Sequence, residues 1–320
     1  MFAKYTSALG ADRANVVADI ATILTGETNP ANLSPDCVQA ATEITATGSP
    51  AGWAMHDAAA GSYAKVIKAP FADAPSSYKF LEINLGISSS YLYLNGYEDW
   101  NATTHIGTNR LTGSNMDSHQ QYSKVSTYEV TWYISASARH CVILTYHGTT
   151  KKGSHSSYGA GPTGVFERTR AMPWDTVTAG YPPWIWANVG TMLTNENVTH
   201  GCYSSRIKRA DGSEVTRQAQ YWGSIGIPYQ NWDSTSATYT PRGASHFIKD
   251  DAGNNLIPLL PIYIYDFANA GFIMGEISSL CDLWVPPCAM LNSLDEMTYN
   301  GNPYIYLGCD SGQGILVRKD

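Results

Sequence analysis

The first residues that could do chemistry form a glycine-containing loop after an apolar run. His140–His147 is typical of a strand, and Gly148 and Gly153 follow it at the spacing of a phosphate-binding loop. Such a loop needs a lysine directly after its second glycine, so that the amine reaches the phosphates. Ser154 stands there instead, and no helical pattern follows. The sequence therefore predicts a mobile loop and no nucleotide cofactor.

Side chains that could bind a metal ion gather around the same run. They are His140, Cys141, His147 and His155, with Asp117 and His119 in the segment before them. No pair has the close spacing of a structural zinc site, and neighbours on a strand point to opposite faces. We favour surface histidines here and predict no metal. Cys281 and Cys288 fit no zinc spacing either, and small buried cysteines are favoured over a disulfide between them.

Acidic residues offer a third kind of chemistry, glycoside hydrolysis, which needs two carboxyl groups across a cleft. The acids near aromatic residues are Glu98, Asp99, Glu129, Glu167, Asp175 and Glu276. Any chain of this length contains as many, so a glycosidase is only a minor alternative. Ser311 does not match the nucleophile motif of serine hydrolases. We predict no catalytic residues and a protein that is not an enzyme.

Aromatic residues with a polar tip are the remaining signal, with 21 tyrosines and 9 tryptophans against 7 phenylalanines. Two clusters stand out: Tyr91, Tyr93, Tyr97 and Trp100 in the first, and Tyr181, Trp184 and Trp186 in the second. Such side chains can fill a core, anchor a subunit interface or stack on sugar rings. All three interpretations stay open. The clusters are therefore the candidate interface or glycan contacts.

Charge limits the partners of the chain. Charged residues make up 15% of the 320 residues, and the net charge is −7. This is below the roughly 25% of charged residues usual in soluble proteins, so we expect neighbours to cover part of the surface. An acidic chain without a long basic run does not predict a nucleic-acid partner. No segment approaches the ~18 apolar residues of a membrane-spanning helix, and Asp12 and Arg13 interrupt any signal peptide. We expect a protein made in the cytoplasm.

The elements that must position these residues differ along the chain. Asp12 is a predicted helix cap, apolar residues follow it at helical spacing, and Gly26 ends the pattern. Ser34, before Pro35, predicts a second helix. Residues 1–70 are therefore predicted to be a small helical segment that makes an assembly contact. Residues 71–155 and 156–320 are predicted to be two β domains, and residues 101–122 a long loop between strands.

Alternating patterns dominate after residue 77. The predicted strands are 78–85, 91–94, 128–135, 140–147, 165–168, 202–209, 214–221, 246–249, 256–265, 272–277, 304–307 and 315–318. The predicted strands 128–135 and 140–147 are joined by the short turn 136–139, which predicts an antiparallel hairpin. Many short strands with regular turns are typical of antiparallel sandwiches or barrels. The predicted fold is mainly β, with antiparallel sandwich-like or barrel-like domains and a small helical N-terminal segment.

Several segments taken together resemble structural proteins of tailed bacteriophage virions. They are 132–140 (WYISASARH), 164–168 (GVFER), 182–184 (PPW), 260–265 (LPIYIY), 275–277 (GEI) and 304–307 (YIYL). The resemblance covers roughly residues 125–310. It lies in the kind of segments and in their order along the chain, and no single motif carries it. The segment 281–284 (CDLW) departs from it, since a stretch richer in glycine and tyrosine is expected there.

The resemblance implies a non-enzymatic part of the virion tail, in the baseplate or fibre-attachment region. Its partners would be copies of itself and other tail proteins, and its place the virion after assembly in the host cytoplasm. A carbohydrate-binding module that recognises a glycan of the host surface is the alternative. No membrane insertion is expected.

Overall fold

The computed structural model describes the N-terminal part of the chain almost completely and the rest in segments. The described residues are 1–45, 52–72, 74–88, 91–110, 120–147, 151–152, 163–167, 184–188, 207–208, 214–215, 219–222, 248–249, 255–256, 263–266, 272–276, 283–284, 294–308 and 314–319. Between residues 184 and 284 the description covers the backbone alone.

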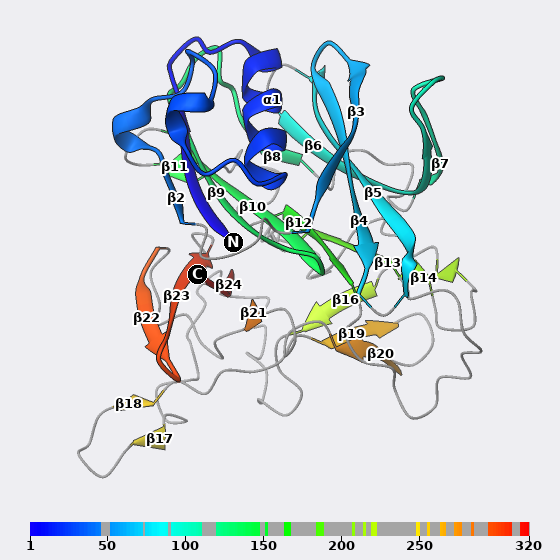
Figure 1. Ribbon diagram of the computed structural model, residues 1–320. Coiled ribbons are helices and arrows are strands. Elements are labelled where there is room, and N and C mark those ends of the chain that lie inside the picture. Colours follow the sequence, from blue (N-terminus) through cyan, green and yellow to red (C-terminus); the bar gives the residue numbers. More distant parts are fainter. Residues whose placement is uncertain are drawn as a thin grey trace, which may run out of the picture.

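The described elements are strands with a single α-helix among them (Figure 1). In the first half they are β1 (Phe2–Ser7), α1 (Arg13–Leu24), η1 (Pro30–Asn32), η2 (Gln39–Ala41), β2 (Glu43–Thr45), β3 (Ala54–Gly61), β4 (Ala64–Phe71), β5 (Ala74–Ser88), β6 (Tyr91–Asn101), β7 (Ile106–Arg110), β8 (Gln120–Tyr122), β9 (Val130–Ser137), β10 (His140–His147) and β11 (Lys151–Lys152). In the second half they are β12 (Thr163–Glu167), β13 (Trp184–Asn188), β14 (Ile207–Lys208), β15 (Glu214–Val215), β16 (Ala219–Trp222), β17 (Ile248–Lys249), β18 (Asn255–Leu256), β19 (Tyr263–Asp266), β20 (Phe272–Glu276), β21 (Leu283–Trp284), β22 (Glu296–Tyr299), β23 (Asn302–Gly308) and β24 (Gly314–Arg318).

Three antiparallel sheets of four or more described strands make up most of the fold. Sheet A has the order β13-β12-β10-β9-β1-β2, with β11 beside β10. Sheet B has the order β3-β4-β5-β6-β7, with β8 beside β6, and the C-terminal sheet has the order β21-β24-β23-β22. The prediction of a mainly β, antiparallel fold is confirmed. The predicted hairpin is also confirmed, because β9 and β10 pair from Val130↔His147 to Ser137↔His140.

Sheet B curls into a half-barrel. Side chains of β3, at one edge, hydrogen-bond with Trp100 of β6 and with His105 before β7, across the two strands that separate β3 from β6. The predicted long loop over residues 101–122 was wrong in part, because it contains β7 and β8. The turn after β6 is built by Asn101, whose Oδ1 accepts hydrogen bonds from the amides of Thr103 and Thr104. This turn sends β7 back along β6.

Helix α1 forms as its sequence predicts and lies against sheet B and β1. Asp12 caps it by accepting a hydrogen bond from the Ala14 amide at 2.8 Å, and Gly26 follows its end with φ of 117°. The predicted second helix at Ser34 was wrong. Ser34 instead donates its amide and hydroxyl protons to Asp19 of α1, at 2.8 and 2.6 Å, which holds it in a turn. With twelve residues, the only α-helix in the described part of the chain is not long enough to cross a membrane.

Residues 1–70, predicted to be a small helical segment, also contribute strands to both large sheets. β1 lies inside sheet A between β9 and β2, and β3 and β4 belong to sheet B. Sheet A also joins β10 to β12, so it crosses the expected boundary near residue 155. The N-terminal segment is therefore built into the body of the fold.

One large apolar core lies between sheet A, sheet B and α1. Its fully buried members include Tyr5, Ile20, Leu81, Trp132 and Ile143. Burying an isoleucine or leucine side chain of this core contributes about 1.5–3 kcal/mol. A second, small cluster of Val66, Phe80 and Trp100 shows that sheet B buries apolar side chains outside the main core as well.

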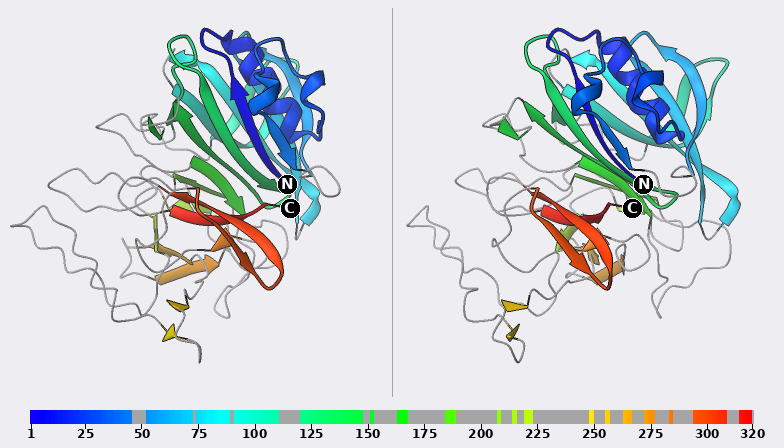
Figure 2. Two further views of the ribbon diagram at one scale, coloured as in Figure 1. Left: turned by 90° about the vertical axis from the view of Figure 1, so that its left-hand side faces the viewer. Right: turned by 60° about the vertical axis from the view of Figure 1, so that its left-hand side comes forward.

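The C-terminal end of the chain lies next to its N-terminal end. The Lys319 Nζ lies 5.9 Å from the centre of the Phe2 ring, and both ends of the chain lie side by side (Figure 2). The strands predicted at 304–307 and 315–318 are confirmed as β23 and β24. In the segment 256–277, β19 and β20 pair with a register shift between Ile264 and Tyr265.

Candidate functional site

The first predicted aromatic cluster lies on one strand, β6. Its four side chains form two pairs: the Tyr91 and Tyr93 ring centres are 6.5 Å apart, and those of Tyr97 and Trp100 are 5.1 Å apart. Tyr93 and Trp100 are buried, with exposed fractions of 5% and 7%, while Tyr91 and Tyr97 are half-buried. Only Tyr91 and Tyr97 therefore offer part of a ring to a partner.

The second predicted cluster belongs to a different sheet. Trp184 and Trp186 lie on β13, an edge strand of sheet A, opposite Glu167 and Val165 of β12. Their side chains and the whole of Tyr181 lie outside the described residues. Trp184 and Trp186 thus stand on a different sheet from the β6 cluster.

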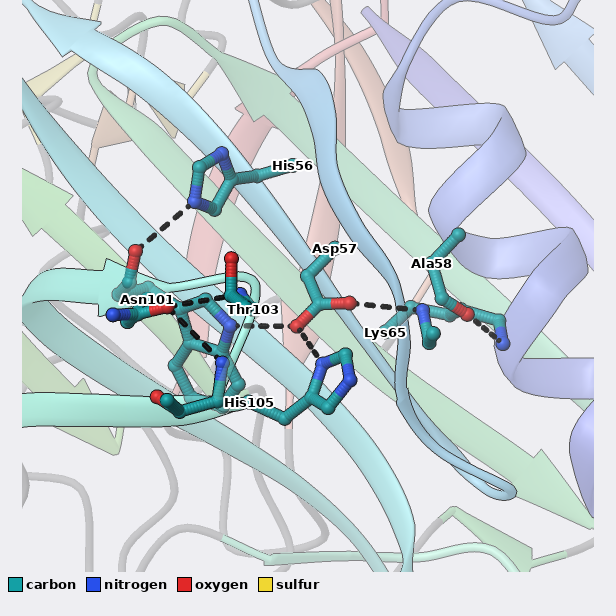
Figure 3. A network of polar contacts seen from close by, with 10 residues as sticks. His56, Asp57, Ala58, Lys65, Asn101, Thr103 and His105 are labelled. Atoms are coloured by element: carbon teal, nitrogen blue, oxygen red, sulfur yellow. Dashed lines mark hydrogen bonds and ion pairs between the residues drawn. The ribbon is translucent and has the colours of Figure 1, made fainter.

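A polar network that the sequence analysis missed lies where the edges of sheet B meet (Figure 3). The Asp57 Oδ2 of β3 accepts hydrogen bonds from the Trp100 Nε1 at 2.8 Å and from the His105 Nδ1 at 2.7 Å. The Asp57 Oδ1 accepts a third hydrogen bond, from the Ala59 amide at 2.9 Å. Next to it, the His56 Nε2 donates to the Trp100 carbonyl at 3.2 Å. These bonds hold the curled sheet closed.

Asp57 is a buried carboxylate with an exposed partner. Asp57 is 3% exposed, whereas the His105 side chain is 40% exposed. Burial by itself would raise the pKa of Asp57, but the hydrogen bonds from His105, Trp100 and Ala59 outweigh it and hold that pKa below its ordinary value. Asp57 therefore stays charged and fixes the orientation of the His105 ring.

The backbone of His105 supports this role. Its φ of 57° lies in the left-handed region, which costs a residue other than glycine about 1 kcal/mol or more. The bonds of Asp57 and the turn made by Asn101 hold it there. The sequence carried one signal for this network: Asp57 is the only acidic residue in the alanine-rich strand Ala54–Gly61.

A second carboxylate on sheet B is equally well satisfied. Glu82 accepts hydrogen bonds from Asn84 at 2.7 Å, Asn95 at 2.9 Å and the Tyr97 hydroxyl at 3.0 Å. Because the Tyr97 ring also contacts Trp100, the two networks adjoin each other. Together they place acidic and amide side chains beside Tyr97 of β6.

The acids considered for glycoside hydrolysis are not arranged as a catalytic pair where the structure describes them. The Glu167 side chain is fully buried and forms an ion pair with Lys79, so it faces no open cleft. Glu129 and Asp99 are exposed on separate strands or turns. Asp175 and the Glu276 side chain lie outside the described residues.

Two of the residues considered as metal ligands, His140 and Cys141, are buried parts of sheet A. His140 is buried, and its ring nitrogens lie 3.1 Å from the Ser135 hydroxyl and 2.9 Å from the Ser137 hydroxyl. Burial lowers the pKa of His140 to about 3 and raises the pKa of Cys141 to about 12. Within the described residues, no three histidine, cysteine, aspartate or glutamate side chains form a group that could hold a metal ion. Asp117, His119, His155, Cys281 and Cys288 lie outside them, as does Gly148–Ser154 except for β11.

No protein-family model matches the chain, and no curated protein matches it either.

Proposed function

We propose that this protein is a non-enzymatic structural component of a bacteriophage tail, in the baseplate or fibre-attachment region. In this role it assembles with copies of itself and with neighbouring tail proteins. The proposal rests on the sequence resemblance, and a feature of sheet B supports it.

The supporting observation is the apolar character of the exposed side chains along the edges of sheet B. Natural edge strands are usually protected by charged side chains or proline. In β3 the single acidic side chain, Asp57, is turned inward, and the exposed residues are Ala54, Met55, Ala58 and Ala59. On the opposite edge, β7 begins with Ile106, which is 60% exposed. Such an apolar rim favours a surface that another subunit covers.

The geometry of this edge favours side-chain packing over the addition of a strand. β3 shifts register twice against β4, at Met55/Asp57 and at Asp57/Gly61, which bends the edge. A partner would therefore contact Met55 and Ile106 next to the closed Asp57 network.

The first test is the mass of the purified chain by light scattering over a concentration series. We expect a defined oligomer in the wild type and a monomer in the double variant Met55→Lys, Ile106→Lys. Tyr299→Lys is the matched control, because Tyr299 is 40% exposed but lies on the C-terminal sheet. A wild type that stays monomeric at every concentration would contradict self-assembly.

The tail position needs its own test. We expect antibodies against the chain to label one site on purified phage tails in electron micrographs. Absence of label from every virion structure would contradict a place in the tail.

A carbohydrate-binding module remains the second candidate, because the Tyr97 hydroxyl bonds to Glu82 next to the Asn95 amide, and the half-buried Tyr91 lies on the same strand. Rings that stack on sugars and side chains that bind hydroxyl groups commonly occur together. A glycan array would test it: binding lost in Tyr91→Ala and kept in Tyr128→Ala, a half-exposed tyrosine outside the β6 cluster, would favour this function.

Glycoside hydrolysis is the third candidate function. The burial of Glu167 argues against it, because a buried acid cannot reach a polysaccharide.

A further inference from the structure

Lys79 and Glu167 meet in the interior between the two large sheets. Lys79 lies on β5 of sheet B and Glu167 on β12 of sheet A, 88 residues apart in the chain. Both side chains are 0% exposed, and the Lys79 Nζ donates a hydrogen bond to a carboxylate oxygen of Glu167. The amine and the carboxyl group are therefore held against each other without access to water.

The surroundings of the pair are largely aromatic and apolar. The Lys79 Nζ lies 5.2 Å from the centre of the Phe71 ring and 5.5 Å from the centre of the Trp53 ring. Burying two full charges away from water in such a place costs much free energy. Burying a neutral amine beside a neutral carboxylic acid costs less. Burial accordingly raises the pKa of Glu167, although Lys79, the Ala72 amide and the charge of Arg139 act in the opposite direction.

The remaining hydrogen bonds arrange the two groups for a reaction. The Ala72 amide donates to the Glu167 Oε2 at 3.2 Å, on the oxygen that would carry negative charge during attack on the carboxyl carbon. The Pro70 carbonyl accepts a hydrogen bond from the Lys79 Nζ at 2.7 Å and orients the amine. Fixing two reactants in this way replaces a bimolecular encounter by an intramolecular step.

We propose that Lys79 and Glu167 condense to an amide bond that links sheet A to sheet B. The substrates are the two side chains themselves, and no added reagent takes part.

The step balances within the pair. The Lys79 ammonium first passes one proton to the Glu167 carboxylate, which gives a neutral amine and a carboxylic acid. The Nζ lone pair then attacks the carboxyl carbon, and the Ala72 amide stabilises the negative charge on Oε2. A second proton moves from Nζ to the hydroxyl oxygen, the C–O bond breaks, and one water molecule leaves. No atom is oxidised or reduced.

The product removes the two buried charges and closes a covalent loop between residues 79 and 167. A cross-link stabilises mainly by restricting the unfolded chain, and more so for a long loop. It would also bear force between the sheets directly. The inference does not depend on the proposed tail position, and its test is independent of oligomeric state.

The first measurement is the intact mass of the denatured wild-type chain. We expect a mass below that of the sequence by one water molecule. A tryptic digest should contain residues 69–110, uncut after Lys79, joined to residues 153–168. The full sequence mass together with normal cleavage after Lys79 would overturn the proposal, even if the protein is folded.

Two variants provide controls. Lys79→Arg keeps a buried cation but lacks the primary amine, so we expect the full mass and separate peptides. The double variant Lys79→Met, Glu167→Met removes both charged groups and tests stability without leaving either one unpaired. We expect it to unfold at a lower denaturant concentration than the wild type, under conditions where both are monomeric. A mass deficit of one water that persists in Lys79→Arg would show that the bond lies elsewhere.

Discussion

The hydroxyl of Tyr5, on β1, donates a hydrogen bond to the Asp19 carboxylate of α1 at 2.7 Å, and both residues are buried. Asp19 also accepts the amide and hydroxyl protons of Ser34. One carboxylate thus joins strand β1 of sheet A, the helix and the turn that replaces the predicted second helix.

Asp19→Ala should therefore destabilise the protein strongly. It leaves buried donors without an acceptor, and each such loss costs about 1–3 kcal/mol. We expect a fall in the free energy of unfolding of about 2–5 kcal/mol in urea denaturation. Tyr5→Phe removes a donor and leaves Asp19 its bonds to Ser34, so it should cost less. Equal losses in the two variants would contradict this account.

The Asp57 network should contribute stability that depends on pH. Because the pKa of Asp57 is lowered in the folded state, its contribution is fully present above the ordinary aspartate pKa of about 3.9. This stabilising contribution is lost as the pH falls from that value through the lowered pKa that Asp57 has in the folded state. Denaturant unfolding at pH 7 and at pH 3 should show a smaller acid-induced loss in Asp57→Asn than in the wild type. An unchanged loss would indicate that other carboxylates cause the acid sensitivity.

His140 should make the free energy of unfolding depend on pH over a higher range than Asp57 does. Its folded pKa of about 3 lies below the ordinary histidine value of 6.5, since burial disfavours the charged ring. Between these values the unfolded chain binds a proton that the folded chain does not, so stability should fall as the pH drops from 6.5 toward 3. In His140→Gln, the slope of unfolding free energy against pH should be smaller over this range. A His140→Gln variant that keeps the wild-type slope over this range would contradict this role of His140.

Gly107 leaves no room for a side chain. A Cβ at this position would lie 2.3 Å from the Cδ1 of Tyr97. Gly107→Ala must therefore displace the Tyr97 ring, which contacts Trp100 and bonds to Glu82, and should cost about 1–3 kcal/mol. Gly61→Ala is the matched control in the same sheet, because its Cβ would meet Ala64 at an ordinary 3.4 Å. Similar melting temperatures for the two variants would contradict the steric explanation.

Local pattern determined several elements of this protein, but not the strands β1, β3 and β4 in residues 1–71. Alternating residues specified β9 and β10 and the turn between them, and Asp12 and Gly26 specified the ends of α1, because these signals act within a few residues. The scarcity of helical patterns after residue 70 was enough to predict a mainly β fold. The same signals failed at Ser34, where a distant carboxylate took the hydrogen bonds that a helix start would use.

Only the tertiary structure decided which of these elements meet. It placed β1 between β9 and β2, brought Asp57 to Trp100 and His105 across the curl of sheet B, and set Lys79 against Glu167. The members of these pairs are 43, 48 and 88 residues apart, and no pattern in the sequence links them. The physical reason is that strand order and sheet curvature result from packing the whole core, whereas periodicity reports only which side of a strand is buried.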